Sequence, residues 1–272
     1  RWQKHSPITS RMRFLSRSII SIVLFSFTGC GDSVSDFQLH EIDPRIIVEF
    51  ELTNGLEVID LNEEFTDDAG YRVRIVEARY LISDLQLESV NGSDIVLKEI
   101  ELIDHREFDE TITTPQWNKS YKFSVPPGEY TNLKFGLGVR SDLNTTDPTD
   151  LPNEDPLSLY GGMHWTWATM YKFVMFHAKI DTLGGSDLLH EVTFETGLDS
   201  LYRSGLSFPV NLSLESFDRD TIRLTVDWNT IFHGSDPIDL TIDNISHTFG
   251  SVEAAELAVR FTDNYVEAIE LD

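Results

Sequence analysis

The chain has 272 residues, and 46 Asp and Glu against 21 Lys and Arg give it a formal net charge of −25 at pH 7. Its 17 Phe, 8 Tyr and 5 Trp supply enough apolar surface for a core, which excludes a disordered acidic protein. A surface this acidic repels the phosphate backbone of nucleic acids, so we expect no nucleic-acid partner. Metal cations are compatible with it.

The start of the chain has the pattern of an export signal. Arg11–Arg17 is basic, Ser18–Phe27 is a short apolar run, and small residues follow before Cys30. The apolar run is too short to cross a bilayer as a helix. We therefore expect residues 1–29 to be a signal peptide, with translation starting at Met12.

Cys30 is the single cysteine, so the chain cannot form an internal disulfide. The segment Phe27-Thr28-Gly29-Cys30 resembles a bacterial lipobox, with Phe where Leu is usual. This resemblance implies cleavage before Cys30 and lipidation of its thiol, which would anchor the protein in the outer membrane, facing the periplasm or the cell surface. A free or buried cysteine after ordinary cleavage is the alternative. Residues 30–44 would form a flexible tether and residues 45–272 a single β domain.

Alternating apolar and polar residues dominate the remaining chain, which is the pattern of half-buried strands. We predict strands at Ile46–Leu52, Tyr71–Tyr80, Leu81–Leu87, Ile95–Leu102, Tyr121–Val125, Thr131–Val139, Tyr171–Ile180, His190–Glu195, Phe208–Leu214 and Thr221–Trp228. Gly136 and Gly138 within one of them suggest a bulge or a close approach of another segment. The fold class is therefore mainly β, an antiparallel β-sandwich or barrel-like domain with long loops.

The C-terminal segment Ser251–Ile269 has a different period. Its apolar residues recur at helical spacing, Ser251 can cap the N-terminus, and Glu253 suits the helix dipole. We predict one C-terminal helix that packs on the sheet.

The segment Asp142–Pro156 is a long acidic loop rich in Asp, Asn, Thr and Pro. Its oxygen atoms could hold calcium, but it lacks the glycine and the final glutamate of an EF-hand loop. We interpret it as a solvated loop, with a calcium site as the weaker alternative.

Motifs typical of enzymes are missing from the sequence: it contains no G-x-S-x-G, no H-E-x-x-H and no P-loop. Carboxylates are too abundant to mark a hydrolase site by themselves, so an acidic hydrolase is only a weak alternative. We expect a protein that is not an enzyme and has no catalytic residue.

The most unusual segment is Gly161–Phe173, in which Trp165 and Trp167 flank Thr166 and follow His164. In a regular strand the two indoles would face one way and His164 the other. Two core aromatics beside a surface histidine are the ordinary explanation for such a pattern.

Several segments in order resemble the MbnP-like family of bacterial exported copper-binding proteins. They are YLISDLQL (residues 80–87), VPPGEYTNLKFGLGV (125–139), the acidic loop, GMHWTWATMYKF (162–173), LTVDWNTIFHGSDPIDL (224–240) and SHTFGSVEAAELAVRFTDNYVEAI (246–269). The resemblance covers roughly residues 45–270. The resemblance also implies kinship with the kynurenine-containing copper proteins MopE and CorA, which are relatives of this family.

The resemblance implies an exported β protein that binds copper, as Cu(I) or Cu(II), for copper acquisition or handling. It implies a Trp oxidised to kynurenine, with Trp165 and Trp167 as candidates, and a modifying partner of the diheme cytochrome c peroxidase type, similar to MbnH. Two imidazoles would complete the site, which suits the nitrogen preference of copper.

The copper-ligand candidates are His164 and His247, followed by His190 and His233. His177 lies on a predicted strand, where a structural role is sufficient, and His105 has no motif support. Because His164 is offset by one residue from Trp165 and by three from Trp167, a shared strand face requires a bulge or a turn. The alternative function is a metal-free β-sandwich surface module that binds a glycan or a protein partner.

Overall fold

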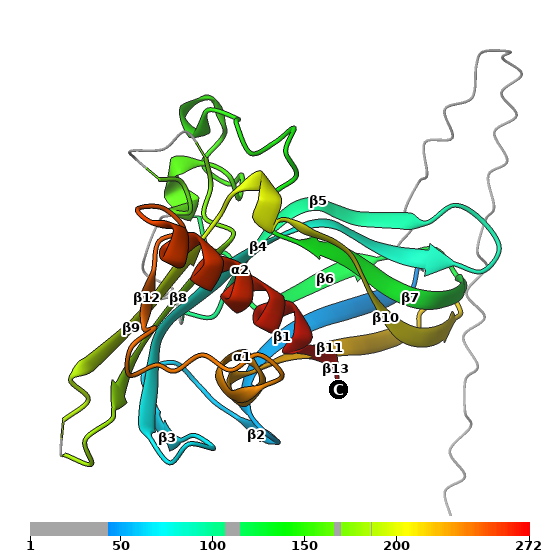
Figure 1. Ribbon diagram of the computed structural model, residues 1–272. Coiled ribbons are helices and arrows are strands. Elements are labelled where there is room, and N and C mark those ends of the chain that lie inside the picture. Colours follow the sequence, from blue (N-terminus) through cyan, green and yellow to red (C-terminus); the bar gives the residue numbers. More distant parts are fainter. Residues whose placement is uncertain (1–42, 107–114, 166–169, 186) are drawn as a thin grey trace, which may run out of the picture. The chain divides into compact units, whose positions relative to one another are not determined.

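The computed structural model describes residues 43–106, 115–165, 170–185 and 187–272 (Figure 1). The predictions for Met12, Cys30, the tether up to residue 42 and Trp167 therefore lie outside the described residues. All described residues belong to one compact unit, Leu39–Asp272.

Two sheets make up the described part of the chain. The first is formed by β13 (Ile269–Leu271), β11 (Arg219–Asp227), β1 (Arg45–Asn54) and β2 (Glu57–Val58), with β6 (Ser120–Ser124) also pairing with β1. The second is formed by β10 (Arg203–Leu214), β7 (Gly128–Leu137), β4 (Arg72–Ser89), β8 (Val174–Asp181), β9 (His190–Thr196) and β12 (Ile245–Ser246), with β3 (Glu64–Thr66) and β5 (Ile95–Asp104) on β4. The predicted mainly β fold is confirmed.

Strand direction is mixed rather than purely antiparallel. β1 pairs with β11 in parallel, and β12 pairs with β9 in parallel, whereas the other strand pairs are antiparallel. The alternation in Ile46–Leu52 identifies the buried face of a strand but carries no information about the direction of its neighbour. This is why the sequence pattern could not separate the two arrangements.

The two segments predicted at Tyr71–Tyr80 and Leu81–Leu87 are one long strand, β4. Its first half pairs with β8 and its second half lies between β5 and β7. Asp84 has a positive φ of 57°, and the register with β5 and β7 shifts close to it. The bulge lies within the half of the strand that pairs with β5 and β7.

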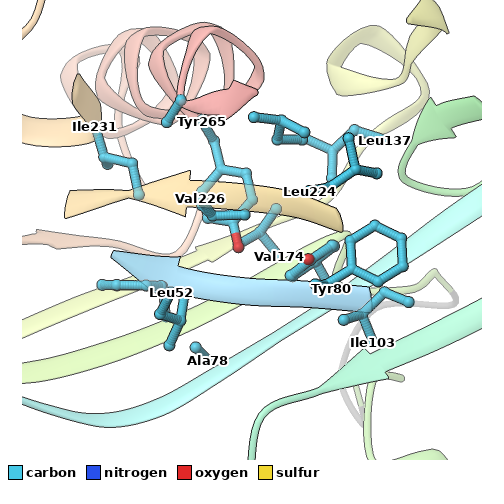
Figure 2. Close-up of a cluster of buried hydrophobic side chains, with 14 of the residues drawn as sticks. Leu52, Ala78, Tyr80, Ile103, Leu137, Val174, Leu224, Val226, Ile231 and Tyr265 are labelled. Atoms are coloured by element: carbon cyan, nitrogen blue, oxygen red, sulfur yellow. The ribbon is translucent and has the colours of Figure 1, made fainter. Parts of the chain in front are cut away.

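The hydrophobic core lies between the sheets and includes one face of the C-terminal helix (Figure 2). Side chains of β1, β4, β8 and β11 meet there those of α1 (Trp228–His233) and α2 (Val252–Glu267). Phe261 of α2 stacks on Phe194 of β9, with ring centroids 4.3 Å apart. The helix therefore covers the inner face of β8 and β9, and their other face is left to polar side chains.

The predicted C-terminal helix is confirmed, and the Ser251 hydroxyl accepts a hydrogen bond of 3.1 Å from the amide of Ala254 as its N-cap. Trp228, predicted as the end of a strand, instead begins α1. The Asp227 carboxylate accepts hydrogen bonds from the amide and the hydroxyl of Thr230. Asp227 is therefore the N-cap of this helix. The described loops contain three short 3₁₀ helices: η1 (Pro148–Asp150), η2 (Leu159–Gly161) and η3 (Asp199–Leu201).

The close approach suggested by the two glycines is confirmed. Gly138 has a φ of +100°, and a Cβ atom there would overlap the ring of Phe173. A Cβ atom on Gly136 would overlap the ring of Tyr202. Both glycines let aromatic rings of neighbouring segments pack directly on β7 and its end.

Candidate functional site

Two of the four predicted copper ligands have structural partners of their own. His190 begins β9, and its Nε2 lies 2.7 Å from the carbonyl oxygen of Leu240. His233 ends α1, and its Nε2 lies 2.9 Å from Oδ2 of Asp67. Burial opposes the charge of Asp67, but the contacts with His233, the amide of Tyr71 and the indole of Trp228 together outweigh it and lower the pKa of this carboxyl. Neither of these contacts involves His164 or Trp165, the described part of the tryptophan segment.

His164 lies in the loop before β8 and forms an isolated β-bridge with Tyr171. The two rings meet edge to face with centroids 5.0 Å apart. Burial of the imidazole lowers the pKa of His164, against a smaller opposing effect of Asp147. The imidazole is therefore neutral near pH 7, which is the state that can bind a metal ion.

Trp165 is a buried side chain, with only 2% of its surface exposed. Its ring packs edge to face on Phe249, with centroids 5.1 Å apart. On another side it meets Gly197, where a Cβ atom would lie 3.0 Å from the indole Cη2 and would overlap the carbonyl oxygen of Tyr171. Gly197 thus leaves room for the indole, and the buried ring offers no open face on which a sugar could stack.

His247 and Phe249 are held by a tight turn centred on Thr248. The amide of Phe249 donates to the carbonyl of His247 at 2.7 Å, and Thr248 has a φ of +67°. A β-branched residue rarely adopts this conformation because its side chain crowds the backbone. The Thr248 hydroxyl donates to the carbonyl of Glu195 at 3.0 Å and accepts from the amide of Gly197 at 3.3 Å, which fixes the turn to the end of β9.

The turn forms part of an open depression of about 520 Å³, lined by Glu195, His247, Phe249 and Gly250. The His247 side chain is about half exposed there, at 49%. Its Nδ1 lies 3.3 Å from Oε2 of Glu195. Because Phe249 also contacts Trp165, the structure places His247 and the His164–Trp165 segment in the same corner of the molecule.

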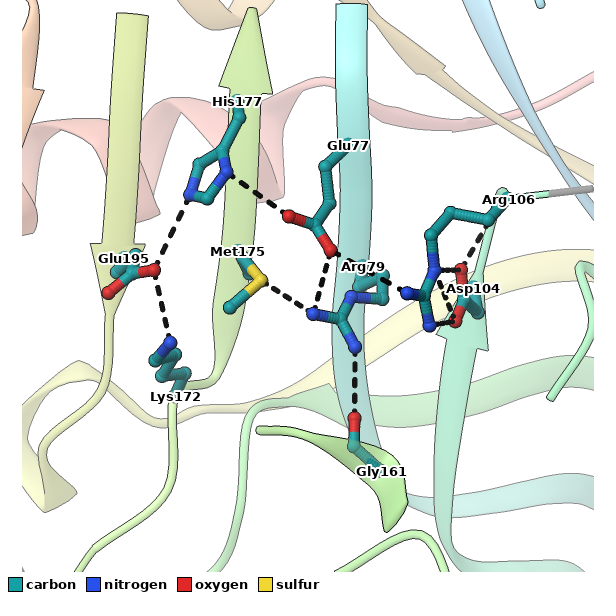
Figure 3. Close-up of polar contacts among 9 residues, drawn as sticks. All are labelled: Glu77, Arg79, Asp104, Arg106, Gly161, Lys172, Met175, His177 and Glu195. Carbon is teal, nitrogen blue, oxygen red and sulfur yellow. Dashed lines mark hydrogen bonds and ion pairs between the residues drawn. The ribbon is translucent and has the colours of Figure 1, made fainter. Parts of the chain in front are cut away.

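The Glu195 carboxylate connects this corner to polar side chains on the outer face of the second sheet (Figure 3). Its Oε1 lies 3.0 Å from Lys172 Nζ and 3.4 Å from His177 Nε2. Burial raises the pKa of Glu195, but the contacts with His177 and Lys172 outweigh it and lower the pKa to about 2. Glu195 is therefore ionised at neutral pH.

His177 lies between two carboxylates. Its Nδ1 is 3.1 Å from Oε2 of Glu77 on β4, and its other ring nitrogen faces Glu195 on β9. Burial favours the neutral imidazole, but the two carboxylates outweigh it and raise the pKa of His177 to about 9. The ring is therefore an imidazolium ion near neutral pH and is unavailable as a metal ligand.

The same contacts continue to the loop that carries the tryptophan segment. Arg79 forms an ion pair of 2.7 Å with Glu77 and donates hydrogen bonds to the carbonyl of Gly161 at 3.0 Å and to Met175 Sδ at 2.8 Å (Figure 3). Gly161 lies three residues before His164 in the same loop. The buried guanidinium thus fixes this loop onto β4.

The contacts that Glu195, Thr248 and His177 make around the candidate site are not predictable from the sequence. Glu195 is one of many acidic residues in predicted strands, and a threonine in a loop gives no signal of a positive φ. The strand position of His177 indicates a structural role, which agrees with its contacts to two carboxylates, but it does not reveal which residues lie opposite it. Their contacts depend on strand register and on a turn that only the folded chain creates.

The donor set suits copper by type. Neutral His164 and half-exposed His247 offer imidazole nitrogen atoms in one corner of the molecule. Within residues 43–106, 115–165, 170–185 and 187–272, however, no group of three or more His, Cys, Asp or Glu side chains could hold a metal ion.

The acidic loop uses carboxylates for its own structure. Asp147 accepts hydrogen bonds from the amide and hydroxyl of Thr149, and Asp155 accepts one from the amide of Leu157. These contacts are typical of Asx turns that stabilise a loop.

None of the helices in the described part of the chain is both long and apolar enough to cross a membrane.

Comparison with known proteins identifies one family. A family model described as MbnP matches residues 43–249. Among solved structures, MbnP from Methylosinus trichosporium is similar, with 18% sequence identity and a TM-score of 0.46 over 71% of this chain and 78% of that chain. No curated protein matches this chain.

Proposed function

Because this chain belongs to the MbnP family, we propose that it is an exported protein that binds and handles copper and is not an enzyme. Family membership over residues 43–249 is the observation that carries the proposal. It is supported by imidazoles and a buried indole in one corner of the described structure.

The proposed ligands are His164 and His247. The contact between the Trp165 and Phe249 rings supports this assignment. His164 directly precedes Trp165 in the chain, and Phe249 lies in the same turn as His247. His190 and His233 are weaker candidates because the carbonyl of Leu240 and the carboxylate of Asp67 already occupy their Nε2 atoms.

Trp165 and Trp167 are the proposed sites of oxidation to kynurenine, whose ketone and aryl amine would supply a third donor. The oxidising partner would be a diheme cytochrome c peroxidase-like protein, similar to MbnH. Lipidation at Cys30 and attachment to the outer membrane are also part of the proposal, as is kinship with MopE and CorA. The lipobox-like segment before Cys30 supports the anchor.

Mass spectrometry of the natively expressed protein tests the modification. The tryptic peptide from residue 141 to Lys172 contains both indoles. We expect fragment ions that assign kynurenine to Trp165 or Trp167. The same sample is then titrated with Cu(I) against a competing chelator.

His164→Ala and His247→Ala should each weaken copper binding, whereas His190→Ala, which removes a histidine outside this corner, should not. Two intact indoles would disprove the modification. Absence of stoichiometric copper binding by a fully modified protein would disprove the function itself.

The second candidate is a metal-free module that binds a protein partner at the open depression beside Phe249. It is favoured by the open depression lined by Glu195, His247, Phe249 and Gly250. A glycan-binding role for Trp165 is disfavoured by the burial of its ring. Binding of a partner in the presence of a strong copper chelator would support this candidate over the first.

A further inference from the structure

The position of His247 depends on an unfavourable backbone conformation at the residue that follows it. Thr248, the next residue, has a φ of +67°, a conformation that is unfavourable for a β-branched residue. Two hydrogen bonds of its hydroxyl fix the turn to Glu195 and Gly197 at the end of β9. Strain of this kind persists only where the surrounding structure enforces it, and it is concentrated at functional sites.

Glu195 acts on the same residue through its side chain. Its Oε2 lies 3.3 Å from Nδ1 of His247, while its Oε1 contacts Lys172 Nζ at 3.0 Å. His177 Nε2 lies 3.4 Å from the same Oε1. Two cations therefore hold one oxygen of the carboxylate in place, and the other oxygen is left for His247.

We infer that Glu195 is a positioning residue for His247: its Oε2 accepts the Nδ1–H of the imidazole, and Nε2 keeps the lone pair that binds copper. The inference rests on the proposed function in taking His247 as a copper ligand. A carboxylate that accepts the second ring N–H of a metal-binding histidine fixes both the tautomer and the ring orientation.

A direct role of Glu195 as a metal ligand is less consistent with its surroundings. Lys172 and His177 place two positive charges beside the carboxylate, and they would repel a metal cation bound to it. Copper also prefers imidazole nitrogen, whereas carboxylate oxygen suits harder cations. The arrangement therefore fits orientation of an imidazole better than metal binding by the carboxylate.

The experiment measures the tautomer of His247 in the metal-free protein. Long-range ¹H–¹⁵N NMR spectra distinguish an imidazole protonated on Nδ1 from one protonated on Nε2, and His247→Asn assigns the signal. The variants are Glu195→Ala and Glu195→Gln. Glu191→Ala is the matched control, because Glu191 lies on the same strand and its side chain is exposed.

We expect His247 to carry its proton on Nδ1 in the wild type and in Glu191→Ala, and to shift toward the Nε2–H form in Glu195→Ala. Cu(I) affinity, measured by competition with a chelator, should fall roughly 10–100-fold in Glu195→Ala. Glu195→Gln should lie between, because its amide oxygen can still accept one hydrogen bond. If Glu195→Ala does not fold, Glu195→Gln decides the question by the same two measurements.

A wild-type His247 protonated on Nε2, or a tautomer unchanged in both variants, would overturn the inference. An undiminished Cu(I) affinity in a variant whose tautomer has shifted would also overturn it. If the wild type binds no copper while the tautomer still responds to Glu195, the proposed function fails and the positioning contact stands.

Discussion

Glu77 and His177 lie opposite each other on β4 and β8, and His177 Nδ1 is 3.1 Å from Glu77 Oε2. Glu195 on β9 faces the other side of the same ring. The outer face of the sheet therefore holds an imidazolium between two carboxylates. One of these carboxylates also contacts His247 in the candidate site.

Replacing His177 by Gln should destabilise the protein in a pH-dependent way. The pKa of His177 is raised to about 9 from 6.5, so its stabilising contribution is complete below about pH 6.5 and is lost as the pH rises through about 9. We expect the variant to lose up to about 3 kcal/mol of unfolding free energy at pH 6, since each pKa unit corresponds to about 1.4 kcal/mol. The loss should be much smaller at pH 10.

Urea unfolding of both proteins at the two pH values measures this difference. Lys179→Met, two residues along the same strand, is the control and should show no such pH dependence. An equal loss for His177→Gln at pH 6 and pH 10 would contradict the assignment of a charged imidazole.

Replacing Arg79 by Met should destabilise the fold and loosen the loop before His164. The change leaves the Glu77 carboxylate without its closest cation and removes the donor to the Gly161 carbonyl. Loss of one partner from a buried ion pair costs about 3 kcal/mol. Hydrogen exchange of residues 157–165 should become faster, as measured by mass spectrometry.

The matched control is Arg74→Met, whose ion pair with Glu64 is exposed and 3.9 Å long. Exposed pairs contribute about 0–1 kcal/mol, so this variant should remain close to the wild type. Equal effects of the two substitutions would show that Arg79 has no special role in holding the loop.

Gly197→Ala should displace Trp165. The new methyl group would overlap the carbonyl of Tyr171 and lie 3.0 Å from the indole. Overpacking of this kind costs about 1–3 kcal/mol. Tryptophan fluorescence should change, and the midpoint of urea unfolding should fall. Gly185→Ala is the control, because a Cβ atom there would come no nearer than 3.9 Å to Asp181.

Thr248→Ala and Thr248→Gly separate the strain of the turn from its hydrogen bonds. Both lose the contacts to Glu195 and Gly197, worth about 1 kcal/mol each, but Gly also relieves the cost of the positive φ. We therefore expect Thr248→Ala to be the less stable of the two in thermal unfolding. The reverse order would show that the turn in solution lacks this conformation.

The sequence alone determined the local structure of most of the chain. The alternation in Ile46–Leu52 and the helical spacing in Ser251–Ile269 predict β1 and α2 because side-chain periodicity follows directly from backbone geometry. The sequence pattern also predicts strands at His177 and Glu195, and both residues lie on strands in the structure. The copper-ligand and kynurenine assignments remain predictions.

Only the tertiary structure decided which of these residues meet. Glu77, His177 and Glu195 come from separate strands, and their contacts depend on strand order and register. The approach of His247 to Glu195 depends on the turn at Thr248, whose positive φ is maintained by contacts with β9. Periodicity determines the face on which a side chain lies, but the neighbouring strand is chosen by packing of the whole chain.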